Sequence, residues 1–268
     1  MHHPDDNPYR APVAAVSDVA PASAPLAFAA PARRVTAGRG AGWIGEGWRL
    51  FKAAPLLWIA VVLLFIVLST LVQLVPLVGG IAALLIGPSL LVGLYAFAHG
   101  IATGEGADIN RFFDGFRDRL GPLLLVGLIY GLLIVLLVIA LIALMFVLGG
   151  GLLAGAEAPE QAIEAAARAL GPNFLLLMLG FLALVMPVVA AYWFAPALVF
   201  YAGLGPLAAM QASLGACLRN WLPFLVYGLL SLLLLLVGML PLLLGLLVVA
   251  PLLCASNYAS FRDLFGQA

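Results

Sequence analysis

Four long stretches without Asp, Glu, Lys or Arg dominate the pattern of polar and apolar positions along the chain. They hold 52 residues between Lys52 and Glu105, 37 between Arg119 and Glu157, 50 between Arg168 and Arg219, and 42 between Arg219 and Arg262. A charged side chain at the centre of a bilayer costs roughly 2.5 to 3.5 kcal/mol, and a spanning helix needs about 20 residues. The pattern therefore predicts an all-α fold, a polytopic membrane helical bundle.

Proline and glycine residues divide these stretches into six predicted transmembrane helices, with five and seven as the alternative counts. Breaks at 76–80 and at Gly238 and Pro241 split the first and the last stretch. Between Leu123 and Ile142, 16 of 20 residues are Leu, Ile or Val, which favours insertion by roughly 6 kcal/mol. The six predicted spans lie near 55–75, 78–101, 121–149, 172–202, 222–239 and 242–260.

Basic residues predict the orientation, since Lys and Arg accumulate on the cytoplasmic side of a membrane. With six spans, 11 of the 12 basic residues share one side with both termini, and only Arg168 lies opposite. Both termini are therefore expected in the cytoplasm. One Lys beside eleven Arg, with abundant Ala and Gly, is typical of a GC-rich bacterial genome, so the expected location is the bacterial inner (cytoplasmic) membrane.

Two segments outside the spans have their own character. Residues 1–35 are rich in Ala and Pro and poor in bulky apolar residues, so they are expected to form a disordered cytoplasmic tail before a membrane domain of residues 36–268. The 150–171 connection is expected to carry a short periplasmic helix over Pro159–Leu170, which ends at a Gly-Pro pair.

The chain also repeats itself, because three amphipathic stretches each run directly into a predicted span. These stretches are Trp43–Lys52, Asp108–Leu120 and Leu207–Asn220. Each is expected to lie along the membrane interface with its apolar face toward the acyl chains, although ordinary loop helices explain the pattern equally well. The apolar face of the clearest stretch consists of Ile109, Phe112, Phe113, Phe116 and Leu120. The sequence thus predicts three repeats, each an interfacial amphipathic helix followed by a transmembrane hairpin.

Three strings carry a resemblance to a known family. They are Gly47-Trp48-Arg49-Leu50-Phe51 followed by Pro55, the segment Arg111–Arg117, and the segment Tyr258–Gly266. Over residues 36–266 the chain resembles a family of small proteobacterial inner-membrane proteins without an established reaction. More distantly, its plan is similar to the membrane domain of glycerophosphodiester phosphodiesterases. The resemblance implies fold and location, and no activity.

Composition excludes the soluble classes of function. Apolar residues make up 65% of the chain and charged residues 9%, the net charge is zero, and the mean hydropathy is +1.18, whereas a soluble domain has roughly 25% charged residues. The expected partner is the lipid bilayer, with no nucleic acid; a membrane-protein partner stays open. No predicted span contains a charged residue and no catalytic motif occurs, so no enzyme, cofactor or metal site is expected.

One polar patch is the candidate site. Tyr95, His99, Asn257 and Tyr258 are the candidates for a polar patch at the cytoplasmic mouth of the bundle, although an aromatic belt is the preferred interpretation of the tyrosines and a half-solvated interfacial position that of His99. The leading hypothesis is an envelope scaffold or accessory factor. The alternative is a facilitative path for a small neutral or amphiphilic solute, and a weaker one is an accessory role in phospholipid metabolism. A packed bundle centre favours the scaffold, and a hollow one the path.

Overall fold

The protein folds as an all-α membrane bundle, with one two-residue strand pair. The computed structural model describes residues 27–76, 78–153, 164, 171 and 174–267. Its helices are α1 (Arg39–Ala53), α2 (Pro55–Gln73), α3 (Gly79–Thr103), the 3₁₀ helix η1 (Ile109–Phe113), α4 (Asp114–Arg117), α5 (Leu120–Leu153), α7 (Phe174–Trp193), α8 (Ala195–Tyr201), α9 (Pro206–Arg219), α10 (Trp221–Met239) and α11 (Leu246–Phe265). Strand β1 (Ala27–Phe28) pairs antiparallel with β2 (Gly266–Gln267).

Five helical segments among the described residues are long and apolar enough to cross a membrane. They are Pro55–Gln73, Gly79–Thr103, Leu120–Leu144, Leu175–Tyr201 and Trp221–Met239. The sixth predicted span, 242–260, is not among them, because the chain forms a turn before α11 begins at Leu246 and the second half of α11 carries polar and charged residues. The six-span count therefore stays a prediction.

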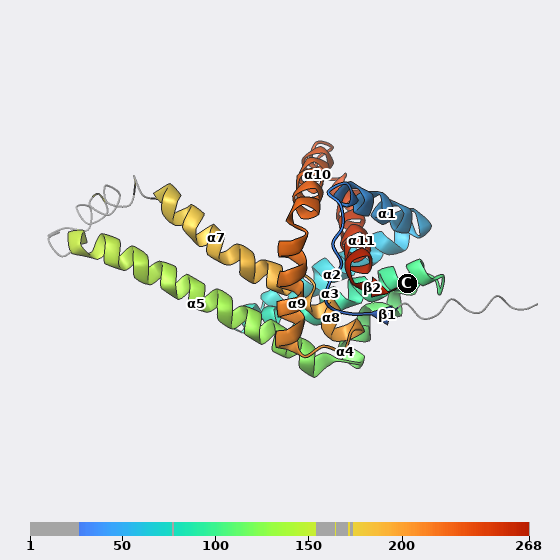
Figure 1. Cartoon of the computed structure of the whole chain (residues 1–268), viewed down its shortest axis with the longest axis horizontal. Helices are drawn as coiled ribbons and strands as arrows, with labels where there is room; N and C mark the ends of the chain where they lie inside the picture. Colours follow the sequence, from blue (N-terminus) through green and yellow to red (C-terminus); the bar gives the residue numbers. More distant parts are fainter. Residues whose placement is uncertain (1–26, 77, 154–163, 165–170, 172–173, 268) are drawn as a thin grey trace, which may run out of the picture.

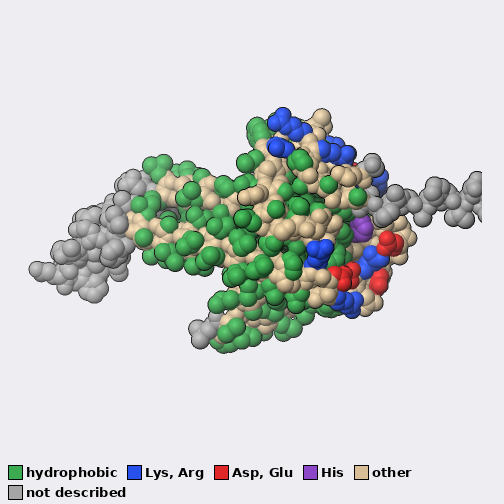
Figure 2. All heavy atoms as spheres, turned by 60° about the horizontal axis from the view of Figure 1, so that its bottom comes forward, with side chains coloured by type: hydrophobic (Ala, Val, Ile, Leu, Met, Phe, Trp, Pro, Cys, Tyr) green, Lys and Arg blue, Asp and Glu red, His purple; other side chains and the backbone are tan. Residues whose placement is uncertain are grey.

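Long apolar arms extend from a compact base. Helices α5 and α7 run side by side as one arm, and α10 leaves the base in a different direction (Figure 1). Leucines along these helices are exposed, as at Leu132, Leu182 and Leu232, which are 57%, 51% and 54% accessible. Figure 2 shows hydrophobic side chains covering the arm and the charged side chains gathered toward the opposite end. The arms are built to face lipid.

The base is held together by aromatic packing. Its largest fully buried side chains include Trp43, Trp58, Tyr258, Phe97, Phe112, Phe194, Phe261 and Phe265. The rings of Phe261 and Phe265 lie 5.5 Å apart, and Trp58 meets Phe97 edge to face at 4.9 Å. Each such ring removes about 150 to 250 Å² from solvent, so the core sits in the base.

The three amphipathic stretches pack on helices of this chain. Helix α1 lies on α11, η1 and α4 lie on α3, and α9 lies on α7 and α8. In α1 the buried residues include Trp43, Leu50 and Phe51, whereas Trp48 remains exposed. Gly47 permits this close approach, because a side chain there would collide with Ser256 of α11. Phe51 is therefore turned into the protein, and the interfacial position of α1 stays a prediction that only the exposed Trp48 could serve.

The second stretch is not one continuous helix. It is a 3₁₀ helix followed by the four-residue α4, and Phe112 is fully buried while Ile109 and Phe113 remain 36% accessible. The side chain of Asp108 accepts a hydrogen bond from the backbone N–H of Asn110. This local bond favours a tight turn over a regular helix start.

The predicted span 172–202 is interrupted in the structure, between α7 and α8. The backbone N–H of Phe194 donates to the Ser213 hydroxyl at 2.9 Å, and that hydroxyl donates to the Ala190 carbonyl at 2.7 Å. The Ser213 hydroxyl is thus inserted between the Phe194 N–H and the Ala190 carbonyl, which would bond each other directly in a regular α-helix. Pro196 removes a further N–H two residues later, so the helix breaks here.

Residues 27–35 are part of the folded structure, although the sequence places them in the tail. The backbone N–H groups of Ala29 and Arg33 donate to the carbonyls of Phe265 and Leu264 at 3.0 and 2.9 Å. These carbonyls end α11 and need partners from outside the helix, which explains why the segment is ordered. Residues 1–26 and nearly all of the predicted periplasmic helix at 159–170 lie outside the described residues.

Candidate functional site

The predicted polar patch divides into two parts. The hydroxyl of Tyr258 lies 2.8 Å from Nδ1 of His99, and the rings of Tyr95 and Tyr258 meet edge to face at 6.1 Å. Asn257 faces elsewhere, where its Oδ1 accepts a hydrogen bond from the Trp193 indole at 2.9 Å. Adjacent residues on an α-helix point about 100° apart, so Asn257 and Tyr258 serve different neighbours.

The Tyr95 hydroxyl is buried between helices. Within the described part of the chain it has no hydrogen-bond partner, and the Tyr95 side chain is 5% accessible. A buried hydroxyl without a partner is uncommon in a packed interior. Tyr95 and Tyr258 are thus buried, whereas His99 is only partly buried.

An aromatic side chain from the N-terminal segment closes the end of the bundle. The ring of Phe28 stacks on Phe261 at 4.8 Å and lies 5.1 Å from Tyr201 and 5.9 Å from His99. These three partners belong to α11, α8 and α3, the second helices of the three predicted hairpins. Phe28 is 8% accessible, so one ring fills the position where those helices meet.

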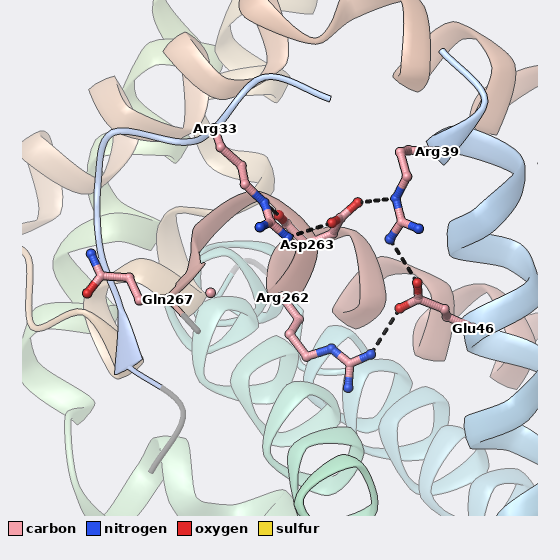
Figure 3. A pocket seen from close by; sticks show the side chains of 7 residues that line it. Arg33, Arg39, Glu46, Arg262, Asp263 and Gln267 are labelled. Atoms are coloured by element: carbon pink, nitrogen blue, oxygen red, sulfur yellow. Dashed lines mark hydrogen bonds and ion pairs between the residues drawn. The ribbon is translucent and has the colours of Figure 1, made fainter. Parts of the chain in front are cut away.

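A charged cluster joins the beginning of the described chain to its end (Figure 3). This base cluster consists of Arg33, Arg39, Glu46, Arg262 and Asp263. Asp263 accepts from Arg33 Nη2 at 2.8 Å and from Arg39 Nε at 2.7 Å. Glu46 accepts from Arg39 at 2.8 Å and from Arg262 at 2.9 Å. The side chains border a cavity of about 230 Å³.

Hydrogen bonds keep the carboxyl group of Asp263 ionised. Burial acts to raise the pKa of Asp263, but hydrogen bonds from Arg39, Trp43 and Arg33 hold that pKa below its ordinary value. The hydrogen bond to Asp263 is the main cause of the raised pKa of Arg39. The pKa shifts of Asp263 and Arg39 therefore both favour their charged forms at neutral pH. Asp263 cannot take up a proton near pH 7, which makes it a structural partner and a poor general base.

The cluster fixes α1 and the segment before it to the end of α11. Trp43 is fully buried, and its indole N–H donates to Asp263 at 2.8 Å. The Nε of Arg33 donates to the main-chain carbonyl of Asp263. This carbonyl lies in the last turn of α11, where it has no partner within the helix. Arg33 therefore supplies the hydrogen bond that the helix itself cannot provide. The cluster is therefore a clasp between the two ends of the described chain.

The sequence alone does not reveal this clasp. Arg33, Arg39 and Arg262 serve there only as indicators of orientation, and Glu46 and Asp263 have no predicted role. Asp263 lies 220 positions from Trp43, so no local periodicity connects them. The one available signal was the position of Asp263 inside a string that carries the family resemblance.

Among the described residues, no three His, Cys, Asp or Glu side chains gather closely enough to hold a metal ion. Cys217 and Cys254 are free thiols, and burial raises the pKa of Cys217 to about 12. A thiol with that pKa is a weak nucleophile at neutral pH.

Comparison with known proteins gives two matches. Residues 74–176 match a family model described as "Predicted integral membrane protein (DUF2189)". A probable inner membrane protein of Burkholderia thailandensis is 30% identical over 201 residues, which cover 73% of each chain. No solved structure matches the chain.

Proposed function

Because the chain belongs to the DUF2189 family of predicted integral membrane proteins, we propose that it is a non-catalytic scaffold or accessory protein of the bacterial inner membrane. It spans the membrane six times, as three hairpins whose ends gather in one cytoplasmic base. The relative from Burkholderia thailandensis is itself a probable inner membrane protein, which supports the location.

Aromatic packing in the base, where the second helices of the three hairpins meet, is the observation that carries the proposal. Where a permeation path would need a lumen, Phe28 lies against Phe261, and Phe261 lies 6.0 Å from Phe194. Phe261 and Phe194 are fully buried. A conduit for polar or neutral solutes needs a wetted path lined by hydrogen-bonding groups. Aromatic packing at this position favours a rigid body that holds other components.

The end of the last hairpin supports the sixth span. Asn220, just before α10, accepts from the Val35 backbone N–H at 3.0 Å and donates to the Arg33 carbonyl at 3.1 Å. Asp263, near the end of α11, binds Arg33 and Arg39. Helix α10 thus begins and α11 ends beside the same segment, which supports a return crossing by α11. The charges at this end (Figure 2) fit a cytoplasmic location.

A flux assay tests the proposal against the conduit. Purified protein is reconstituted into liposomes, and the entry of glycerol and of larger neutral solutes is followed by stopped-flow light scattering. We expect the wild type and Phe28→Ala to match protein-free liposomes. Saturable flux through the wild type, or flux that appears only when Phe28 is truncated, would assign a conduit and overturn the scaffold.

Photo-crosslinking in living cells supplies the positive test. A crosslinking amino acid replaces Leu132 or Leu182 on the exposed arm, and Asp118 at the base serves as the control position. A scaffold predicts discrete, reproducible protein adducts from an arm position. Adducts with lipid alone at both arm positions would contradict it.

A further inference from the structure

Two adjoining clefts open between α7 and α10, with volumes of about 530 and 640 Å³. We call them together the lateral cleft. One extends to Leu253 and Asn257 of α11, and the other to Leu218 and Trp221 at the junction of α9 and α10. The residues that line both are Met186, Ala190, Cys217, Phe224 and Gly228. Binding pockets for small molecules have volumes of roughly 300 to 1,000 Å³.

The lateral cleft lies at membrane depth. Its walls belong to the candidate spans Leu175–Tyr201 and Trp221–Met239. Helices α7 and α10 diverge as they leave the base (Figure 1). A side chain added at Gly228 would meet nothing within 4 Å, so the middle of the cleft is open space. The surroundings of such a space in a bilayer are acyl chains.

An exposed arginine directly follows one of the residues that line the cleft. Arg219 lies in the sequence between Leu218 and Trp221, which both line the cleft. Its side chain is exposed, and nothing in the described structure forms an ion pair with it. By contrast, Arg33, Arg39 and Arg262 are engaged in the base cluster. An exposed arginine beside a tryptophan at a membrane interface suits a lipid phosphate.

We propose that the lateral cleft binds one phospholipid, with the phosphate on Arg219 and an acyl chain between α7 and α10 past Gly228. The cleft is too small to enclose a whole spanning helix. A spanning helix about 10 Å across and 30 Å long occupies roughly 2,400 Å³, whereas the larger cleft holds about 640 Å³. The unpaired cation supplies the charge complementarity for a phosphate and none for an apolar helix. This site goes beyond the scaffold role and does not depend on it.

Lipid titration tests the proposal with the full chain. The protein is delipidated in detergent and titrated with palmitoyl-oleoyl-phosphatidylglycerol, and bound lipid is counted by native mass spectrometry. Gly228→Leu fills open space and is expected to weaken binding of the first lipid at least tenfold. Arg219→Gln removes one phosphate contact and is expected to weaken it about fivefold.

Matched controls separate the site from general effects on lipid binding. Gly180→Leu adds the same side chain on α7, where a side chain also meets nothing within 4 Å and no cleft is lined. Arg49→Gln removes an exposed arginine of α1. Both controls should retain the lipid like the wild type, and all variants should keep the wild-type elution volume. Equal loss in controls and test variants, or full retention by Gly228→Leu, would overturn the proposal.

Discussion

Removal of the Asp263 carboxylate should destabilise the base of the protein substantially. The carboxylate accepts hydrogen bonds from Arg33, Arg39 and Trp43. Trp43 is fully buried, so its indole N–H would lose its acceptor at a cost of about 1 to 3 kcal/mol. The two arginines are 57% and 38% accessible, so solvent limits each ion pair to about 0.2 to 1 kcal/mol. Together these contributions amount to about 1.4 to 5 kcal/mol for Asp263→Ala.

The assay is thermal unfolding of the purified protein in one detergent at neutral pH. For a chain of about this size, each kcal/mol corresponds to roughly 2 to 4 °C in Tm, so Asp263→Ala should lower Tm by about 3 to 20 °C. Asp118→Ala removes an exposed carboxylate of the base that has no ion pair within the described residues, and it should leave Tm unchanged. An Asp263→Ala variant within 1 °C of the wild type would refute the clasp.

Three further results are expected from the same assay. Ser213→Ala should lower stability by about 1 to 3 kcal/mol, because the buried N–H of Phe194 loses its acceptor; an unchanged Tm would mean that the helix break does not depend on the hydroxyl. Gly47→Leu should displace α1 and lower Tm, whereas Gly45→Leu, where a side chain has open space, should not; equal effects would contradict the close packing on α11. The pKa of Asp263 lies below its ordinary value of 3.8, so its stabilisation is complete above about pH 5 and disappears as pH falls through the lowered pKa. The Tm difference between wild type and Asp263→Ala should therefore be constant from pH 8 to 5 and shrink below about pH 4, and a difference that shrinks already between pH 8 and 6 would count against the ionised carboxylate.

The long apolar helices could be predicted from the sequence because their formation depends on local information. A run such as Leu123–Ile142 must satisfy its backbone within itself in lipid, and α5 occupies that region in the structure. The boundary between α10 and the turn after it was also predicted closely, since Gly238 and Pro241 mark it.

The features that depend on distant residues could not be predicted in this way. The break at Phe194 requires a hydroxyl from another helix, Ser213. The order of residues 27–35 requires free carbonyls at the end of α11, which the composition of an Ala/Pro-rich segment cannot reveal. Within the candidate patch, helical periodicity alone suffices to separate Asn257 from Tyr258, but it cannot identify Trp193 as the partner of Asn257.

Cysteine accessibility tests the central claim, that three hairpins cross the membrane and their ends meet in one cytoplasmic base. In a background with Cys217 and Cys254 replaced by Ala, single cysteines are placed at Gly203, Leu242 and Gln267 and probed with a membrane-impermeant thiol reagent. The cytoplasmic base predicts that Gly203→Cys and Gln267→Cys react only in inside-out vesicles and Leu242→Cys only in right-side-out vesicles. Reaction of Gln267→Cys and Gly203→Cys from opposite sides of the membrane would leave an odd number of crossings after Gly203 and contradict the account.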